Sequence, residues 1–198
     1  VYLYTVPKVH IEDLKVETSL DDSYTNAELR IQCNTNAPVS ASADISLSYH
    51  GTEIFHKHER LGRDNQFSFI IKKPELWSAE APNLYDLEIK VMDADGDIQE
   101  IIPQKVGFRC FELKCGLMMI NGKRIVFNGV DRHDFSSLTG RAVRREDVIK
   151  DIITMKRNNI NAIRTSHYPN VSMLYDLCDE YGLYMIAENN METHGIWD

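Results

Sequence analysis

The fold of the chain is decided by residues 146–187, which read EDVIKDIITMKRNNINAIRTSHYPNVSMLYDLCDEYGLYMIA. Apolar residues between Glu146 and Arg157 recur at the spacing of one face of a helix. A second helical stripe ends at Gly182, and short apolar runs at 160–165 and 183–187 follow the two stripes. Alternating helices and apolar strands predict a parallel sheet with helical crossovers.

The ends of both predicted helices carry suitable residues. Acidic residues open the first helix, and Lys156 and Arg157 lie in its last turn, which suits the helix dipole. Asn158-Asn159 can supply a left-handed stop after it. The second helix is expected to start at Pro169-Asn170 and to end at Gly182.

A hairpin signal precedes these helices. Residues 117–120 and 124–130 flank Asn121-Gly122, a strong two-residue turn signal. The second half therefore reads strand, helix, strand, helix, strand. Three strands are too few to close a barrel of eight, but the pattern matches the start of a TIM (β/α)₈ barrel.

The first half of the chain alternates with period two, which is typical of strands with one buried face. Turn signals such as Ala94-Asp95-Gly96-Asp97 separate the alternating segments, which are residues 14–20, 27–33, 43–49, 67–71 and 85–91. About seven short strands over roughly a hundred residues predict an immunoglobulin-like β-sandwich. We therefore expect a multidomain β plus α/β chain, with the sandwich in residues 1–112 and an incomplete barrel in residues 113–198.

Composition limits the partners and the cellular compartment. Acidic residues number 30 against 22 basic ones, for a net charge of −8, so nucleic acid is a poor expectation. No apolar run is long enough to span a membrane. The four cysteines show no C-x-x-C spacing, which argues against a zinc site and favours reduced thiols in a cytoplasmic protein.

Polar residues gather just after the three predicted parallel strands, where barrels carry their sites. His133 follows the first strand, Arg164 and His167 the second, and His194 the third. Any one of these histidines has about even odds of being structural, whereas all three together favour a site. Neutral imidazoles beside an arginine suit the hydroxyls of a neutral sugar.

A possible metal pair lies in the last of these segments. Glu192 and His194 are two residues apart, so an extended backbone places both side chains on one face. A carboxylate with an imidazole can bind a hard or borderline divalent ion. The spacing is common by chance and is weak evidence alone.

Several motifs resemble glycoside hydrolase family 2. Residues 161–186 resemble the first signature of that family, with Arg164, His167-Tyr168-Pro169, Asp179 and Gly182 at the right spacing. Further segments resemble its sandwich domain and barrel entry, namely residues 73–78, 82–85, 106–109, 121–123 and 129–133. Glu192-Thr193-His194-Gly195 is typical of the β-galactosidase branch, although that branch often has Asn where this chain has Asp131. The similarity covers nearly the whole chain, which is expected to be an internal piece of a longer protein.

The resemblance implies a retaining β-galactosidase that hydrolyses terminal non-reducing β-D-galactose residues. His133 and His167 would contact the sugar, and Arg164 would orient the nucleophilic glutamate. Glu192 and His194 would be ligands of an active-site Mg²⁺. Both catalytic glutamates belong to later barrel strands in the family, so no catalytic residue is expected in this chain, which would be inactive alone. The parent enzyme is expected to be a homo-oligomer.

Three alternatives stay open. A β-glucuronidase of the same family would need a basic pocket for the sugar carboxylate, and none can be identified in the sequence. A non-catalytic sugar-binding module could stack Trp77 and Tyr85 on a sugar, although these residues fit core packing better. The chain could also act by complementing a second polypeptide.

Overall fold

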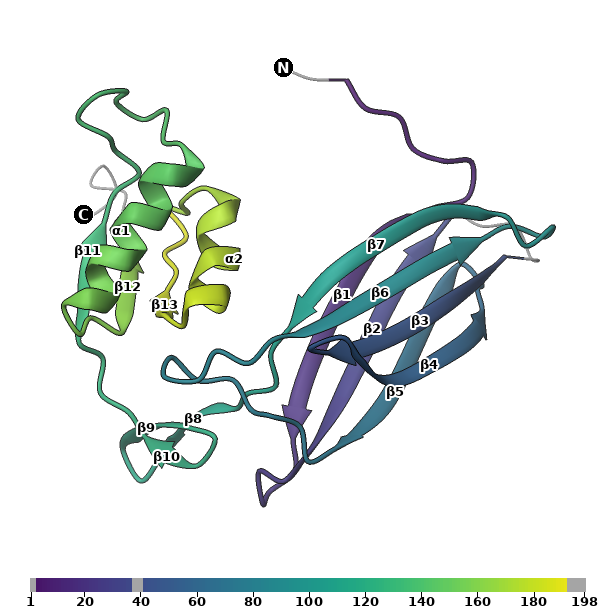
Figure 1. Ribbon diagram of the computed structural model, residues 1–198, viewed down its shortest axis with the longest axis horizontal. Coiled ribbons are helices and arrows are strands. Elements are labelled where there is room, and N and C mark those ends of the chain that lie inside the picture. Colours follow the sequence, from purple (N-terminus) through teal and green to yellow (C-terminus); the bar gives the residue numbers. More distant parts are fainter. Residues whose placement is uncertain (1–2, 37–40, 192–198) are drawn as a thin grey trace, which may run out of the picture. The chain divides into compact units, whose positions relative to one another are not determined.

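The computed structural model describes residues 3–36 and 41–191, which form two compact units (Figure 1). The first unit comprises Val1–Leu76 and Asn83–Phe111, and the second comprises Trp77–Pro82 and Glu112–Asp198. Six residues from the middle of the sandwich sequence thus group with the second unit.

The first unit is a sandwich of two antiparallel sheets. One sheet has the order β1-β2-β5, with β1 at Ile11–Leu20, β2 at Asn26–Thr35 and β5 at Asp64–Lys72. The other has the order β4-β3-β6-β7, with β3 at Ser42–Tyr49, β4 at Thr52–Arg60, β6 at Tyr85–Met92 and β7 at Ile98–Val106. The predicted sandwich class is confirmed.

The core of the sandwich comes from alternate residues of its central strands. Leu29 and Ile31 of β2, Ile45 of β3, and Leu87 and Ile89 of β6 are all buried. Successive side chains of a strand point to opposite faces, so period two in the sequence becomes one buried face per sheet. The predicted turn before β7 is present, with Gly96 at a φ of +85°.

A small antiparallel sheet of order β10-β9-β8 follows, with β8 at Phe111–Lys114, β9 at Leu117–Ile120 and β10 at Lys123–Arg124. Asn121 and Gly122 form the predicted turn, with φ values of +50° and +75°. The hairpin leading into a strand, expected over residues 117–130, is present, with a break of four residues between the end of β10 at Arg124 and the start of β11 at Gly129. The side chain of Asn161 accounts for the break, since it bonds the backbone of Val126 and Asn128.

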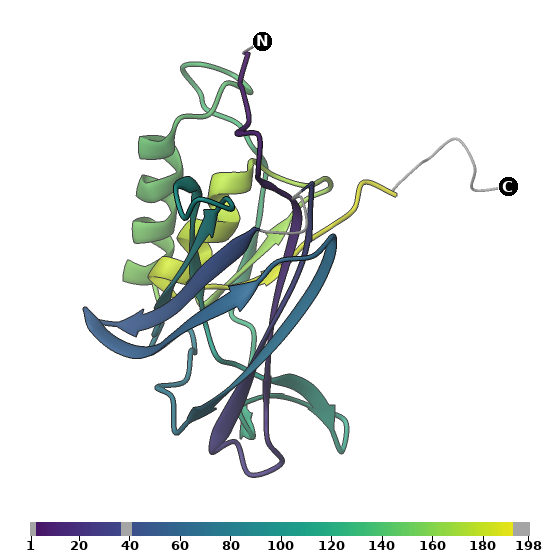
Figure 2. The same cartoon turned by 90° about the vertical axis from the view of Figure 1, so that its right-hand side faces the viewer.

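The rest of the second unit is the expected β-α-β-α-β segment. Parallel strands β11 (Gly129–Arg132), β12 (Ala162–Thr165) and β13 (Tyr184–Ile186) lie in that order. Helices α1 (Arg145–Arg157) and α2 (Ser172–Tyr181) cover one face of this sheet (Figure 2). Their shared core consists of Val148, Ile152, Ile163, Leu174, Leu177, Cys178 and Leu183. Among the described residues, no helix has the length and apolarity needed to cross a membrane.

The helix ends only partly follow the sequence signals. Asn159 is left-handed after α1 with a φ of +57°, and Gly182 closes α2 in the left-handed conformation, both as predicted. Helix α2 starts at Ser172, later than the expected Pro169-Asn170. Asn170 is instead buried, with its side-chain oxygen turned to Arg132.

Residues 77–82, which we call the strap, are anchored within the second unit. Trp77 is 2% exposed, donates from Nε1 to the carbonyl of Asp179 at 2.8 Å, and meets the ring of Tyr184 edge-on at 5.8 Å. Lys156 Nζ donates to the carbonyls of Ala79 and Gly182, both at 2.8 Å. The strap therefore fixes the C-terminal ends of both helices.

Candidate active site

The C-terminal ends of the parallel strands bring the predicted polar residues to one edge of the sheet. Asp131 of β11 pairs in register with Arg164 of β12, which pairs with Ile186 of β13. Along the extended segment 131–134, Asp131 and His133 are exposed whereas Arg132 and Asp134 are buried. The alternation places the side chains of Asp131 and His133 at the site and those of Arg132 and Asp134 in the protein interior.

The two predicted histidines face each other across this edge. The ring centroids of His133 and His167 are 5.8 Å apart with an interplanar angle of 82°. Tyr168 lies beside them, with its hydroxyl 3.3 Å from Nδ1 of His133. The structure thus brings together His133, His167 and Arg164, which the sequence analysis selected separately.

Arg164 is the centre of the exposed cluster. Its Nη1 donates to Asp131 at 3.1 Å, and its Nη2 forms an ion pair with Glu188 and lies 3.2 Å from Nδ1 of His167. The hydrogen bond to Asp131, with the negative charge of Glu188, raises the pKa of the Arg164 guanidinium. Asp131 and Arg164 also line a hollow of about 310 Å³ beside the sheet. The site therefore presents a cation that two carboxylates hold in place.

Glu188 is a site residue that the sequence analysis did not select. It lies two residues beyond the end of β13, and its backbone N–H donates to the hydroxyl of Thr165 at 2.9 Å. Its carboxylate pairs with Arg164 and comes within 3.5 Å of Nδ1 of His167. The strand-end position that selected the histidines is the signal that could have found it.

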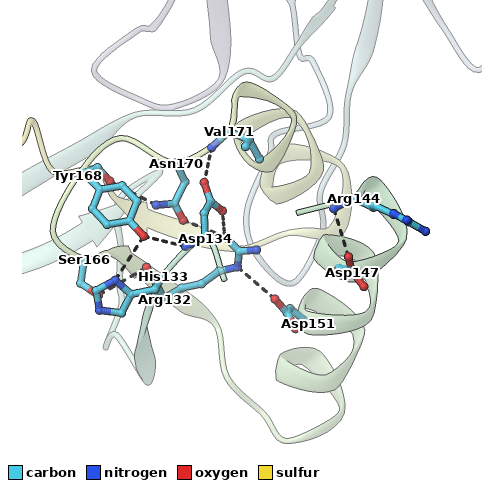
Figure 3. Close-up of polar contacts among 10 residues, drawn as sticks. All are labelled: Arg132, His133, Asp134, Arg144, Asp147, Asp151, Ser166, Tyr168, Asn170 and Val171. Atoms are coloured by element: carbon cyan, nitrogen blue, oxygen red, sulfur yellow. Dashed lines mark hydrogen bonds and ion pairs between the residues drawn. The ribbon is translucent and has the colours of Figure 1, made fainter. Parts of the chain in front are cut away.

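A second polar layer contains the buried residues Arg132, Asp134 and Asn170 (Figure 3). Arg132 Nη1 contacts the carboxylate of Asp134 and donates to Oδ1 of Asn170 at 2.8 Å, while Nε donates to Asp151 of α1 at 3.2 Å. Asp134 accepts the N–H of Val171, where α2 begins, at 2.7 Å. The end of β11 is thereby tied to both helices.

This buried layer is also charged and nearly dry. Arg132 is 5% exposed and Asp134 is 7% exposed. Arg132 Nη2 is buried without a hydrogen-bond partner among the described residues. A guanidinium in such surroundings depends on its paired carboxylate, since an uncompensated buried charge is costly.

The predicted metal ligands Glu192 and His194 lie outside the described residues. Within residues 3–36 and 41–191, no group of three or more His, Cys, Asp or Glu side chains is placed to hold a metal ion. From the described residues alone, the site is a cluster of imidazole, guanidinium and carboxylate groups.

The described residues form a β-sandwich followed by a β-α-β-α-β segment consistent with the start of a TIM barrel, with polar groups at its strand ends. The family model "Glycosyl hydrolases family 2" matches residues 9–109, and "Glycosyl hydrolases family 2, TIM barrel domain" matches residues 111–198. The chain belongs to glycosyl hydrolases family 2.

Curated relatives are β-galactosidases. The chain is 61% identical to beta-galactosidase BgaC of Bifidobacterium adolescentis and 48% identical to the beta-galactosidase of Priestia megaterium. In both cases the whole chain is covered, and it spans about 20% of the relative. The chain therefore corresponds to about a fifth of the length of these proteins.

Similar solved structures are β-glucuronidases at lower identity. The β-glucuronidase of Bifidobacterium dentium, complexed with coumarin-3-O-glucuronide, gives a TM-score of 0.85 at 26% identity, with 92% of this chain and 31% of that chain covered. Apo β-glucuronidase 3 of Bacteroides uniformis gives a TM-score of 0.84 at 26% identity, with 91% and 23% covered.

Proposed function

We propose that the chain is part of a retaining β-galactosidase that hydrolyses terminal non-reducing β-D-galactose residues. The observation that carries the proposal is the convergence of His133, Arg164 and His167 at the carboxyl edge of the parallel sheet. In barrels this edge carries the active site. The identity of 61% to a β-galactosidase supports galactose as the sugar.

Each of these side chains has a role that its chemistry suits. The exposed imidazole of His133 and the partly exposed imidazole of His167 offer donors and acceptors to sugar hydroxyls. Arg164 holds a permanent charge that can orient a carboxylate. Its present partners Asp131 and Glu188 keep the guanidinium aimed along the strand ends, where a nucleophilic glutamate would meet it.

The two catalytic glutamates are proposed to come from later barrel strands of the whole protein. In retaining hydrolysis one carboxylate attacks the anomeric carbon and forms a glycosyl–enzyme intermediate. The other protonates the leaving oxygen and then activates water. Glu188 is committed to Arg164 through an ion pair, which suits a positioning role better than either of these.

A magnesium ion is the proposed cofactor, with Glu192 and His194 as the ligands from this chain. One carboxylate and one imidazole make an incomplete set for Mg²⁺, which prefers oxygen ligands. A further carboxylate of the whole protein would have to complete the site. Calorimetric titration of the whole protein with Mg²⁺ should show binding that Glu192→Gln weakens, and equal affinity in both proteins would contradict the assignment.

Substrate choice separates the proposal from the β-glucuronidase alternative. The whole protein should release nitrophenol from a nitrophenyl β-D-galactoside and have little activity on the β-D-glucuronide. Faster turnover of the glucuronide would overturn the proposal. The 198-residue chain alone should show no turnover, and activity that survives removal of host enzyme would place a catalytic carboxylate within these residues.

The role of Arg164 can be tested with a matched arginine. Arg164→Gln in the whole protein should lower kcat by about a hundredfold, because a misplaced reacting carboxylate costs that much. Arg157→Gln, at the exposed end of α1, should leave kcat unchanged. Similar losses of kcat in both variants would contradict a specific role for Arg164 in the active site.

A further inference from the structure

The hydroxyl of Tyr168 lies between two groups of the segment that carries His133 (Figure 3). The backbone N–H of Asp134 is 3.1 Å from the Tyr168 oxygen, and Nδ1 of His133 is 3.3 Å from the same oxygen. The ring of His133 is tilted 45° to that of Tyr168, with centroids 5.7 Å apart. One hydroxyl thus contacts both the backbone and the imidazole of consecutive residues.

The direction of these two hydrogen bonds follows from the chemistry of the groups. A backbone N–H can only donate, so the Tyr168 oxygen accepts from Asp134. The hydroxyl retains one proton, and Nδ1 of His133 is its remaining partner among the described residues. If Nδ1 of His133 instead donated to the Tyr168 oxygen, that oxygen would accept two hydrogen bonds. The hydroxyl proton would then have no partner among the described residues. With the Tyr168 hydroxyl donating to Nδ1, the proton of a neutral His133 is on Nε2.

The hydroxyl is held in this position by its surroundings. Asp134 is fixed by Arg132 and by the N–H of Val171, so the amide that donates to Tyr168 cannot turn away. On the other side, the guanidinium of Arg141 lies 5.2 Å from the centroid of the Tyr168 ring. A cation over the ring face restrains the ring by electrostatic attraction.

We propose that Tyr168 is a positioning residue that holds His133 as the Nε2–H tautomer, so that the site offers a neutral donor to an oxygen of the sugar. The proposal deepens the β-galactosidase function and rests on it for the identity of the ligand. It explains why a tyrosine is built against the segment of His133. Without the Tyr168 hydroxyl, the proton of the His133 imidazole could move from Nε2 to Nδ1, so that Nε2 becomes an acceptor. The ring could also rotate out of place.

The first test reads the tautomer directly and needs no activity. The protein is labelled with ¹⁵N in its histidine side chains and studied by NMR at a pH where histidine is neutral. His133, assigned with a His133→Gln variant, should have a protonated Nε2 and a hydrogen-bonded Nδ1. In Tyr168→Phe the Nδ1 signal should move toward that of a free imidazole, whereas His56 and His58 of the sandwich should not change. A protonated Nδ1 in the unaltered protein, or no change in the variant, would overturn the proposal.

The second test is a double-mutant cycle on the whole protein. A glutamine amide has no tautomers and can place an N–H near the position of Nε2, so His133→Gln should retain more kcat/KM than His133→Asn. Tyr168→Phe should lower kcat/KM about three- to tenfold in the His133 background, the range expected for one hydrogen bond. It should lower kcat/KM less in the His133→Gln background, because only the contact with the backbone N–H of Asp134 is lost there and the contact with the imidazole is already absent.

Tyr175→Phe is the control for Tyr168→Phe. Tyr175→Phe removes a hydroxyl from helix α2 and should change neither the ¹⁵N spectrum of His133 nor kcat/KM. Equal losses from Tyr168→Phe in both backgrounds would assign Tyr168 a general structural role and refute the proposal. If the whole protein hydrolyses no β-galactoside, the proposed function fails, and the NMR result still decides the tautomer.

Discussion

Replacement of Gly182 by alanine should destabilise the second unit far more than the same change at another left-handed glycine. Gly182 ends helix α2 with a φ of +76°, and a Cβ built there lies 2.4 Å from the carbonyl oxygen of Ala79 in the strap. The left-handed backbone costs an alanine about 1–2 kcal/mol. The collision is with backbone, which cannot rotate away, and adds about 1–3 kcal/mol.

Gly140 is the matched control for this change. Its φ is +62° and a Cβ there has nothing within 4 Å, so Gly140→Ala carries the backbone cost of about 1–2 kcal/mol alone. Gly182→Ala should therefore lower the free energy of unfolding by about 2–5 kcal/mol. The difference between the two variants measures the contact between α2 and the strap.

The assay is urea unfolding followed by the fluorescence of Trp77, which is packed in the strap. The chain has two tryptophans, so Trp197, outside the described residues, is replaced by phenylalanine in every variant. Equal shifts in the two glycine variants would refute the reasoning, because the close approach of Ala79 would then carry no energy.

Three further predictions concern ionisable side chains that are buried or hydrogen-bonded. Asp134→Ala should cost about 3 kcal/mol in urea unfolding, because it leaves the buried guanidinium of Arg132 with the half-exposed carboxylate of Asp151 as its remaining ion pair, and Asp134→Asn should cost less. Burial raises the pKa of the Cys178 thiol to about 12, so mass spectrometry after iodoacetamide treatment at pH 8 should find Cys115, which is exposed, modified first. The backbone N–H of Thr25, with other local donors, lowers the pKa of Asp21 to about 2. Because this folded value lies below the usual one near 3.9, Asp21 stabilises the fold above about pH 4 and loses that effect as the pH falls toward 2, so Asp21→Asn should flatten the fall of Tm in that window.

The regular elements were predictable because their cause is local. Period two along β2, β3 and β6 reflects one buried face per sheet, and the stop at Gly182 reflects a backbone conformation that favours glycine. The length of the break between β10 and β11 was not predictable, because the side chain of Asn161, more than thirty residues away, bonds the backbone of Val126 and Asn128.

The candidate site was likewise only partly predictable from the sequence. His133 and Arg164 could be selected because strand ends are sites in parallel sheets. Arg132 and Asp134 look like ordinary surface charges in the sequence, and only the contacts with α1 and α2 show that they are buried. The roles given to Glu192 and His194, and the domain boundary after residue 112, stay predictions.

Because of the strap, the sequence of the sandwich and that of the barrel segment cannot be exchanged independently. Trp77 is encoded within the sandwich but fills a place in the barrel segment, where it meets Tyr184 and the carbonyl of Asp179. A recombination event that joined this sandwich to a foreign barrel near residue 112 would bring the wrong partner for that indole. Variation in the strap and in the end of α2 must therefore be selected together, although a hundred codons separate them.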